Sequence, residues 1–328
     1  MTTAVEAPVA PPRGLATPCV GVCRIDPETR YCSGCARTSD EISRWSTASE
    51  DERQAIWNAL PERFDALGVQ TRRLPWSGSQ AMDFVERSIK DAAGTWVLGV
   101  LGAVGEFTRT AGETLELRRR SDQHGAETLE AVVPRAALRL HLDDSVRTLI
   151  VEAPDTTTKV VLAVKRAAQP LEARSAVTDL GLDANAIVPE AHDQRLFDLG
   201  IGRSAAQFCV RSETPTMLSA LESAQGVQWP DWLSALGPTV IAESPVRVIK
   251  TRIGRVEIDA PIPAPGGASP PGPHTHLLPA HLAQGLDAPA DLQLPEAYVP
   301  GAVFYPTSGE QSHVEALLSG VATSREHR

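Results

Sequence analysis

The 328-residue sequence lacks the features that mark membrane proteins and nucleic-acid binders. Its longest apolar run, Trp96 to Val104, is about half as long as a membrane-spanning helix requires. Its formal net charge is −10, whereas a nucleic-acid binder carries a basic surface. The same charge disfavours binding to an anionic membrane surface. We therefore expect neither nucleic acid nor membrane among the partners.

The N-terminus has no basic segment followed by a long apolar stretch, so a secretory signal is not recognisable. We therefore expect a cytoplasmic protein. Aromatic residues make up only 5% of the chain, and the five cysteines are too few for a disulfide-rich scaffold. In a reducing compartment, clustered thiols indicate metal or redox ligands rather than disulfides.

Four of the five cysteines nevertheless lie close together, with the spacing C-x3-C-x8-C-x2-C. They are Cys19, Cys23, Cys32 and Cys35. Two close pairs joined by a short loop can converge on one metal ion or one iron–sulfur cluster, because thiolates bind soft and borderline metals strongly. Arg24, Arg30 and Arg37 are near enough in sequence to offset the negative charge of four thiolates. The sequence therefore predicts a metal centre at this segment.

The segment from Pro18 to Ser46 resembles a bacterial domain-of-unknown-function family of small predicted iron–sulfur proteins. The shared pattern is P-C-x3-C-x-I/L-D-x5-C-x-G-C-x-R-T-x2-E-I-x2-W, and every fixed position is present, Trp45 included. The resemblance covers residues 18–66 and implies an iron–sulfur cluster on the four cysteines. Spacing and ligand chemistry alone leave a cluster and structural zinc both open.

Length and composition predict about two domains. Residues 1–17 are predicted to be a disordered tail, residues 18–67 the four-cysteine module, and residues 68–80 a linker. Residues 81–306 are predicted to form a larger domain, and residues 307–328 a C-terminal helix and tail. The module is too small to bury much core, so we expect its metal to supply much of its stability.

Hydrophobic periodicity indicates an α+β protein. In the module, Ser49 and Glu52 form a predicted capping box before a helix. The larger domain has helical patterns at 82–92, 192–200, 215–224 and 276–284. It has strand patterns at 113–119, 136–142, 146–153, 159–166, 205–211, 245–252 and 254–260. No βαβ rhythm with a glycine-rich loop is present, so the sheet is predicted to be mainly antiparallel.

The larger domain also resembles an uncharacterised bacterial family with no known activity. The shared features are G-x-x-G-A-x-x-E-F from Gly99 to Phe107, LFDLG-x-G from Leu196 to Gly202, and FCVR from Phe208 to Arg211. A proline-rich segment containing H-T-H, from Pro261 to Pro279, completes them. This resemblance implies no substrate, cofactor or catalytic residue.

Three of the eight histidines lie together at His274, His276 and His281. In an extended segment, the first two point to the same side and can chelate one metal ion, and His281 can join them from a following helix. Glu257 and Asp259, on one face of a predicted strand, are the candidate carboxylate ligands. Alternatively, the histidine pair anchors the proline-rich loop through hydrogen bonds, binds an anion, or takes part in acid–base catalysis.

The sequence leaves three functions open. The first is an iron–sulfur protein with a redox or accessory role and a protein partner. The second is a zinc-stapled protein-interaction module attached to an α+β binding domain. The third is a metal-dependent enzyme with its site around His274 and His276. No complete set of nucleophile, base and oxyanion donors is recognisable, so the sequence assigns no catalytic residue.

Overall fold

The computed structural model describes residues 17–20, 23–68, 70–100, 102–152, 158–167, 176–201, 206–263, 270–277, 292 and 294–307. The chain divides into two compact units, Met1–Val69 and Gln70–Arg328, called here the N-terminal unit and the larger unit. Among the described residues, no helix is both long and apolar enough to cross a membrane.

The N-terminal unit contains two helices, α1 (Ser39–Arg44) and α2 (Glu50–Leu67). The predicted capping box at the start of α2 is confirmed, since the Ser49 hydroxyl accepts from the Glu52 amide and the Glu52 carboxylate accepts from the Ser49 amide. One face of α2 forms the small core of this unit. Among the described residues, its buried side chains are Trp57, Leu60 and Phe64 of α2 with Ala36 of the loop before α1, and Trp45, Ile56 and Leu67 pack against them. A core of this size supplies little stability by itself.

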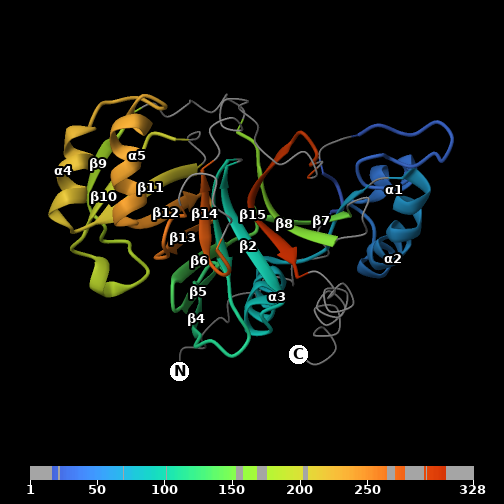
Figure 1. Ribbon diagram of the computed structural model, residues 1–328. Coiled ribbons are helices and arrows are strands. Elements are labelled where there is room, and N and C mark those ends of the chain that lie inside the picture. Colours follow the sequence, from blue (N-terminus) through green and yellow to red (C-terminus); the bar gives the residue numbers. More distant parts are fainter. Residues whose placement is uncertain are drawn as a thin grey trace, which may run out of the picture. The chain divides into compact units, whose positions relative to one another are not determined.

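Within the described residues, the larger unit forms two antiparallel sheets, which confirms the α+β class (Figure 1). The first sheet has seven strands in the order β1-β7-β8-β15-β2-β3-β14. Its strands are β1 (Thr71–Arg73), β2 (Gly94–Val100), β3 (Ala103–Thr108), β7 (Arg147–Glu152), β8 (Thr158–Lys165), β14 (His274–Leu277) and β15 (Tyr298–Pro306). Among the strands that the structure describes, β14 therefore lies at an edge of this sheet and pairs with β3.

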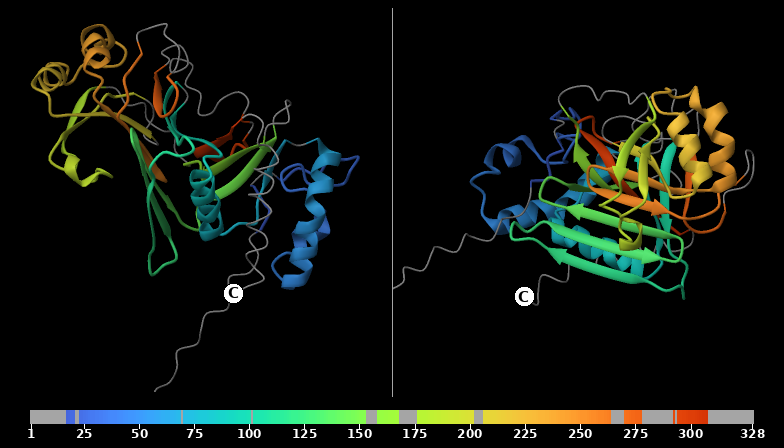
Figure 2. Two further views of the ribbon diagram at one scale, coloured as in Figure 1. Left: turned by 60° about the horizontal axis from the view of Figure 1, so that its bottom comes forward. Right: turned by 90° about the vertical axis from the view of Figure 1, so that its left-hand side faces the viewer.

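The second sheet has eight strands in the order β4-β5-β6-β13-β12-β11-β10-β9. Its strands are β4 (Glu116–Ser121), β5 (Glu127–Val133), β6 (Ala136–Leu142), β9 (Thr178–Leu182), β10 (Arg195–Asp198), β11 (Ala206–Ser212), β12 (Val246–Thr251) and β13 (Gly254–Ile258). The helices of the larger unit are α3 (Gly78–Lys90), η1 (Pro189–Ala191), α4 (Pro215–Ser223) and α5 (Trp232–Glu243). Helix α3 packs against β5 and β6, and α4 lies beside α5 (Figure 2).

The core of the larger unit lies where β2 and β3 of the first sheet face β11, β12 and β13 of the second. The two sheets are in close contact at Gly105. A Cβ atom there would lie 2.7 Å from Cγ1 of Val256 and 2.8 Å from Cδ1 of Ile249. Side chains alternate along β3, so the neighbour of this buried glycine, Glu106, points to the opposite, partly exposed face. Glycine at position 105 thus allows β3 to pack closely against the second sheet.

Two predicted helices of the larger unit are wrong where the structure describes them. Residues 195–198 form strand β10, because Leu196 and Phe197 are both buried and pair with Arg211 and Val210 of β11. Leu196 and Leu199 have a helical spacing, but burial on both faces of the segment and pairing with β11 favour a strand. Residues 276 and 277 end strand β14, and residues 278–284 of the second predicted helix lie outside the described residues.

Other differences concern the segments that join and end the domains. The predicted linker contains strand β1 and the first turn of α3, whose N-cap is Ser77. Strand β15 was not predicted, because Pro300 and Gly301 interrupt its pattern, and the pairing with β8 shifts register there. Residues 1–16 of the predicted tail and residues 308–328 of the predicted C-terminal helix lie outside the described residues.

Candidate metal centres

A tight loop positions the second cysteine pair. Ile25 forms an isolated antiparallel bridge with Cys32. The Cys32 amide donates to the carbonyl of Arg37 (2.8 Å), and the amides of Cys35 and Ala36 both donate to the carbonyl of Cys32 (3.1 and 2.7 Å). These bonds fold residues 32–37 into a compact knuckle, so the C-x2-C spacing brings both sulfurs to one side of a turn. Local backbone geometry therefore arranges this pair.

The four thiols form one connected set. A negative charge on Cys19 raises the pKa of Cys23, burial and the charge of Cys32 raise it further, and the Cys19 side chain hydrogen-bonds to Cys23. Burial would raise the pKa of Cys32, but hydrogen bonds from the Gly34 amide and the Cys35 side chain lower it. Cys32 and Cys35 are buried, whereas Cys19 is half-buried and Cys23 is exposed. The set thus has a buried side and an open side.

Arg37 is a charged group in direct contact with one of these thiols. Its Nε lies 3.5 Å from Sγ of Cys35, and its guanidinium stacks on the ring of Trp45 at 4.7 Å. The side chain is only 3% exposed. Its Nη1 atom is buried and has no hydrogen-bond partner among the described residues. Burial raises the pKa of Cys35, and the contact with Arg37 opposes that rise. The arginine therefore favours negative charge on the buried sulfur.

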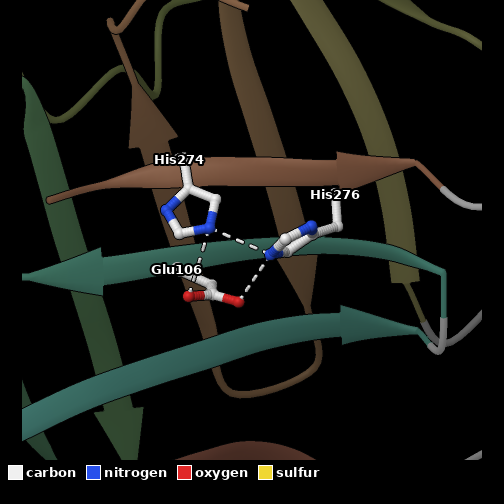
Figure 3. Close-up of side chains that lie close together, drawn as sticks. All are labelled: Glu106, His274 and His276. Carbon is white, nitrogen blue, oxygen red and sulfur yellow. Dashed lines mark hydrogen bonds and ion pairs between the residues drawn. The ribbon is translucent and has the colours of Figure 1, made fainter. Parts of the chain in front are cut away.

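A second cluster joins His274 and His276 of β14 to Glu106 of β3 (Figure 3). His274 pairs directly with Glu106 in the strand register, and the two-residue spacing puts His276 on the same face. The Nε2 atom of His276 lies 2.9 Å from Oε1 of Glu106, and Nε2 of His274 lies 3.5 Å from Oε2. The two Nε2 atoms are 2.9 Å apart. Three potential ligand atoms therefore lie within 4.8 Å of one another.

The cluster is partly buried, and the pKa values of two of its groups are shifted. The side chains of His274, Glu106 and His276 are 12%, 24% and 31% exposed. The hydrogen bond to Glu106 raises the pKa of His276. Burial alone would raise the pKa of Glu106, but the hydrogen bond from His276 and the charges of both histidines lower it. The arrangement therefore favours an ionised carboxylate beside the imidazoles.

The structure brings together the histidine pair that the sequence singled out but supplies a different carboxylate. In the sequence, the only signal for Glu106 is its place in the glycine-containing G-x-x-G-A-x-x-E-F segment. His281 lies outside the described residues. Of the two expected carboxylates, Asp259 has its backbone amide bound to the carbonyl of Arg135, and its side chain is not part of the cluster.

Glu257, the other expected carboxylate, is fully engaged in a buried ion-pair network. Its Oε2 accepts from Arg211 (2.8 Å), and its Oε1 accepts from Arg255 (2.6 Å) and from the Ile187 amide (2.8 Å). Asp183 accepts from the same two arginines. All four charged groups of this network are buried. Each carboxylate is paired with two guanidinium groups, and the network links β11 and β13 to the residue that follows β9. Both oxygens of Glu257 are therefore already engaged, and Glu257 is not available as a metal ligand.

Comparison with protein families identifies both parts of the chain. Residues 17–64 match the family described as protein of unknown function (DUF1289), and residues 80–314 match the family of unknown function (DUF6925). The first match confirms the family resemblance of the cysteine segment, and neither description names a metal. No curated protein and no solved structure matches the chain. Because the second match spans more than half of the sequence, this protein belongs to the family of unknown function DUF6925, with a DUF1289 segment before it.

Proposed function

We propose that this is a metal-binding protein whose N-terminal unit holds an iron–sulfur cluster and serves a redox or accessory role. The cluster would be held by the four clustered thiols, Cys19, Cys23, Cys32 and Cys35. The observation that carries the proposal is the connected set of thiols with a buried arginine beside it. Four thiolates are the usual ligand set of two-iron and four-iron clusters.

Arg37 supports the fit of a negatively charged centre. A buried donor without a partner costs about 1–3 kcal/mol, and Nη1 of Arg37, which has no partner within the described part of the chain, is such a donor. Thiolate or sulfide acceptors near it would remove that cost. Hydrogen bonds and charges around the ligand sulfurs also tune the potential of a cluster. The guanidinium therefore has a role both in holding the centre and in setting its redox behaviour.

The uneven burial of the thiols supports electron exchange with a protein partner. Cys32 and Cys35 are 0% and 1% exposed, whereas Cys23 lies at the surface. When bound, a cluster supplies a site that gains or loses one electron, and the open side around Cys23 would be the point of approach for a partner. Such a partner is expected to be another redox protein.

Structural zinc is the alternative, and one observation favours it. The described core of the N-terminal unit has few large side chains. A closed zinc site with four thiolate ligands would therefore supply stability to the cysteine-containing loop. In that case the unit would act as a zinc-stapled interaction module. The larger unit would then carry the activity.

One experiment separates the two. The full chain is purified without oxygen, and visible absorption, iron, zinc and acid-labile sulfide are measured on the same sample. Broad visible absorption with iron and sulfide in equal amounts is the expected result. A colourless sample with one zinc per chain bound by the cysteines would replace the cluster by the zinc alternative. A sample with neither metal after reconstitution would refute both.

A further inference from the structure

We infer that Glu106, His274 and His276 form a second metal site, in the larger unit, that binds one divalent transition-metal ion. The inference is independent of the cysteine centre, because it rests on different residues in a different unit. The ligand set is two imidazole nitrogens and one carboxylate. No family description or comparison assigns a metal to these residues.

The strand geometry places the three ligands on one face of the sheet. Glu106 and His274 face each other across the antiparallel pair of β3 and β14, and His276 follows two residues later on the same face. Strand β14 is held from the other face too, because the Thr275 hydroxyl accepts from Nε of the buried Arg247 (3.3 Å). Ligands fixed on a sheet lose little conformational entropy when a metal binds.

A backbone carbonyl selects the tautomer of His274 that a metal needs. Nδ1 of His274 donates to the carbonyl of Gly272 at 2.8 Å. In the neutral ring, that bond leaves a lone pair on Nε2, which points at His276 and Glu106 (Figure 3). Metal-binding histidines commonly donate their other ring N–H to a carbonyl in this way. Gly272 can direct its carbonyl there because its φ is +87°, a left-handed conformation that favours glycine.

Counting hydrogens shows that the cluster has too few donors for its contacts. With His274 in this tautomer, its Nε2 carries no hydrogen, and the Glu106 carboxylate is an acceptor only. Nε2 of His276 carries at most one hydrogen, yet it lies 2.9 Å from both Oε1 of Glu106 and Nε2 of His274. One hydrogen cannot donate well in both directions at once. A metal cation that displaces the hydrogen on Nε2 of His276, releasing it to water as a proton, would be bound by a lone pair from each of the three groups.

The ligand set defines the class of metal. Imidazole suits Zn²⁺, Fe²⁺ and the other late first-row ions, whereas Mg²⁺ and Ca²⁺ prefer oxygen ligands. Three protein ligands leave coordination positions open, and the exposure of His276 leaves room for water on that side. Sites with two histidines, one carboxylate and open positions support metal-activated water or oxygen chemistry. The second site therefore belongs to the reactive kind rather than the structural kind.

Cobalt is the probe that separates the two centres within the intact protein. Full-length protein is stripped of metal and titrated with Co²⁺ alone, with total bound cobalt measured beside the visible spectrum. Cobalt on the cysteines gives a thiolate-to-metal charge-transfer band, whereas cobalt on nitrogen and oxygen ligands gives only weaker ligand-field bands. We expect both signals in the wild-type chain. Excess Mg²⁺ should displace neither.

The variants Glu106→Gln and His276→Ala test the assignment. Each should bind one cobalt fewer per chain and lose the sulfur-free bands, with the charge-transfer band unchanged. The control is His141→Ala, an exposed histidine of β6 bonded to Thr128, which should keep both signals. Glu106→Gln preserves side-chain volume, so its larger unit should unfold cooperatively as in the wild type.

Two results would overturn the second site. One is an unchanged cobalt count in both variants, which would make the cluster a hydrogen-bonded clamp on the edge strand. The other is displacement of the sulfur-free cobalt by Mg²⁺, which would place it on oxygen ligands elsewhere. As a further check, Zn²⁺ should raise the unfolding temperature of the larger unit in the wild type and not in Glu106→Gln. Loss of the charge-transfer band alone would count against the proposed function and leave the second site standing.

Discussion

The two proposed metal centres differ in how the chain would assemble them. The cysteine ligands all lie between positions 19 and 35, in a unit with a small core. Glu106 and the histidine pair are far apart in sequence and meet because two strands of a large sheet pair in register. A ligand set of the first kind depends on its metal for order, whereas one of the second kind is arranged by the fold before metal arrives. The predictions below test that difference.

The largest effect is expected for Cys32→Ser. Losing one of four thiolates should remove most metal from the N-terminal unit and unfold it, because its core is too small to hold it folded. The larger unit should stay folded. Metal analysis combined with limited proteolysis of residues 18–66 measures both effects. Cys209→Ala, which changes the buried cysteine of β11, is the control. Unchanged metal content and protease resistance in Cys32→Ser would refute the prediction that the four cysteines bind one metal centre.

The second-largest effect is expected for Gly105→Val, which should damage the larger unit and spare the N-terminal unit. The added side chain would collide with Val256 and Ile249, so the larger unit should lose about 1–3 kcal/mol of unfolding free energy. Because Glu106 is the next residue, the second metal site should weaken while the cysteine centre is unaffected. Denaturant unfolding and the cobalt spectrum measure these outcomes. Gly237→Ala is the control, since its Cβ would meet Leu233 at an ordinary 3.5 Å. Equal loss at both centres would contradict the independence of the two units.

An intermediate effect is expected for Arg37→Lys. Lysine keeps the charge but loses the planar group that contacts Cys35 and stacks on Trp45. Loss of such a supporting contact typically lowers metal affinity by about 10- to 100-fold. Metal competition with a coloured chelator measures this change, with Arg24→Lys as the control. If the affinity does not change, Arg37 has only a packing role.

The smallest effect is expected for Gly272→Ala. Its φ of +87° makes alanine unfavourable by about 1–2 kcal/mol, and any shift of its carbonyl would release Nδ1 of His274. We expect weaker cobalt binding at the second site only. Gly125→Ala is a matched control, because Gly125 also has a positive φ (+78°) and open space around its Cβ. Similar cobalt affinity in the two variants would show that the carbonyl contact does not matter.

Several elements of the fold could be predicted from local sequence patterns. The capping box at Ser49 and the strand at 136–142 were both predictable, because they depend on neighbouring residues and simple periodicity. Strands β10 and β15 were not. The first has helical leucine spacing, and the second is interrupted by Pro300 and Gly301. Each is a strand because neighbouring strands pair with it, and one segment's sequence does not contain that information.

The same division applies to the candidate sites. By itself, the sequence determined the four-cysteine pattern, the family of its segment and the same-side placement of His274 and His276, because these follow from local spacing. Only the tertiary structure decided that Glu106 completes the histidine pair and that Glu257 is occupied by Arg211 and Arg255. Which carboxylate reaches a distant strand depends on sheet order and register, and these are set by the packing of the whole unit.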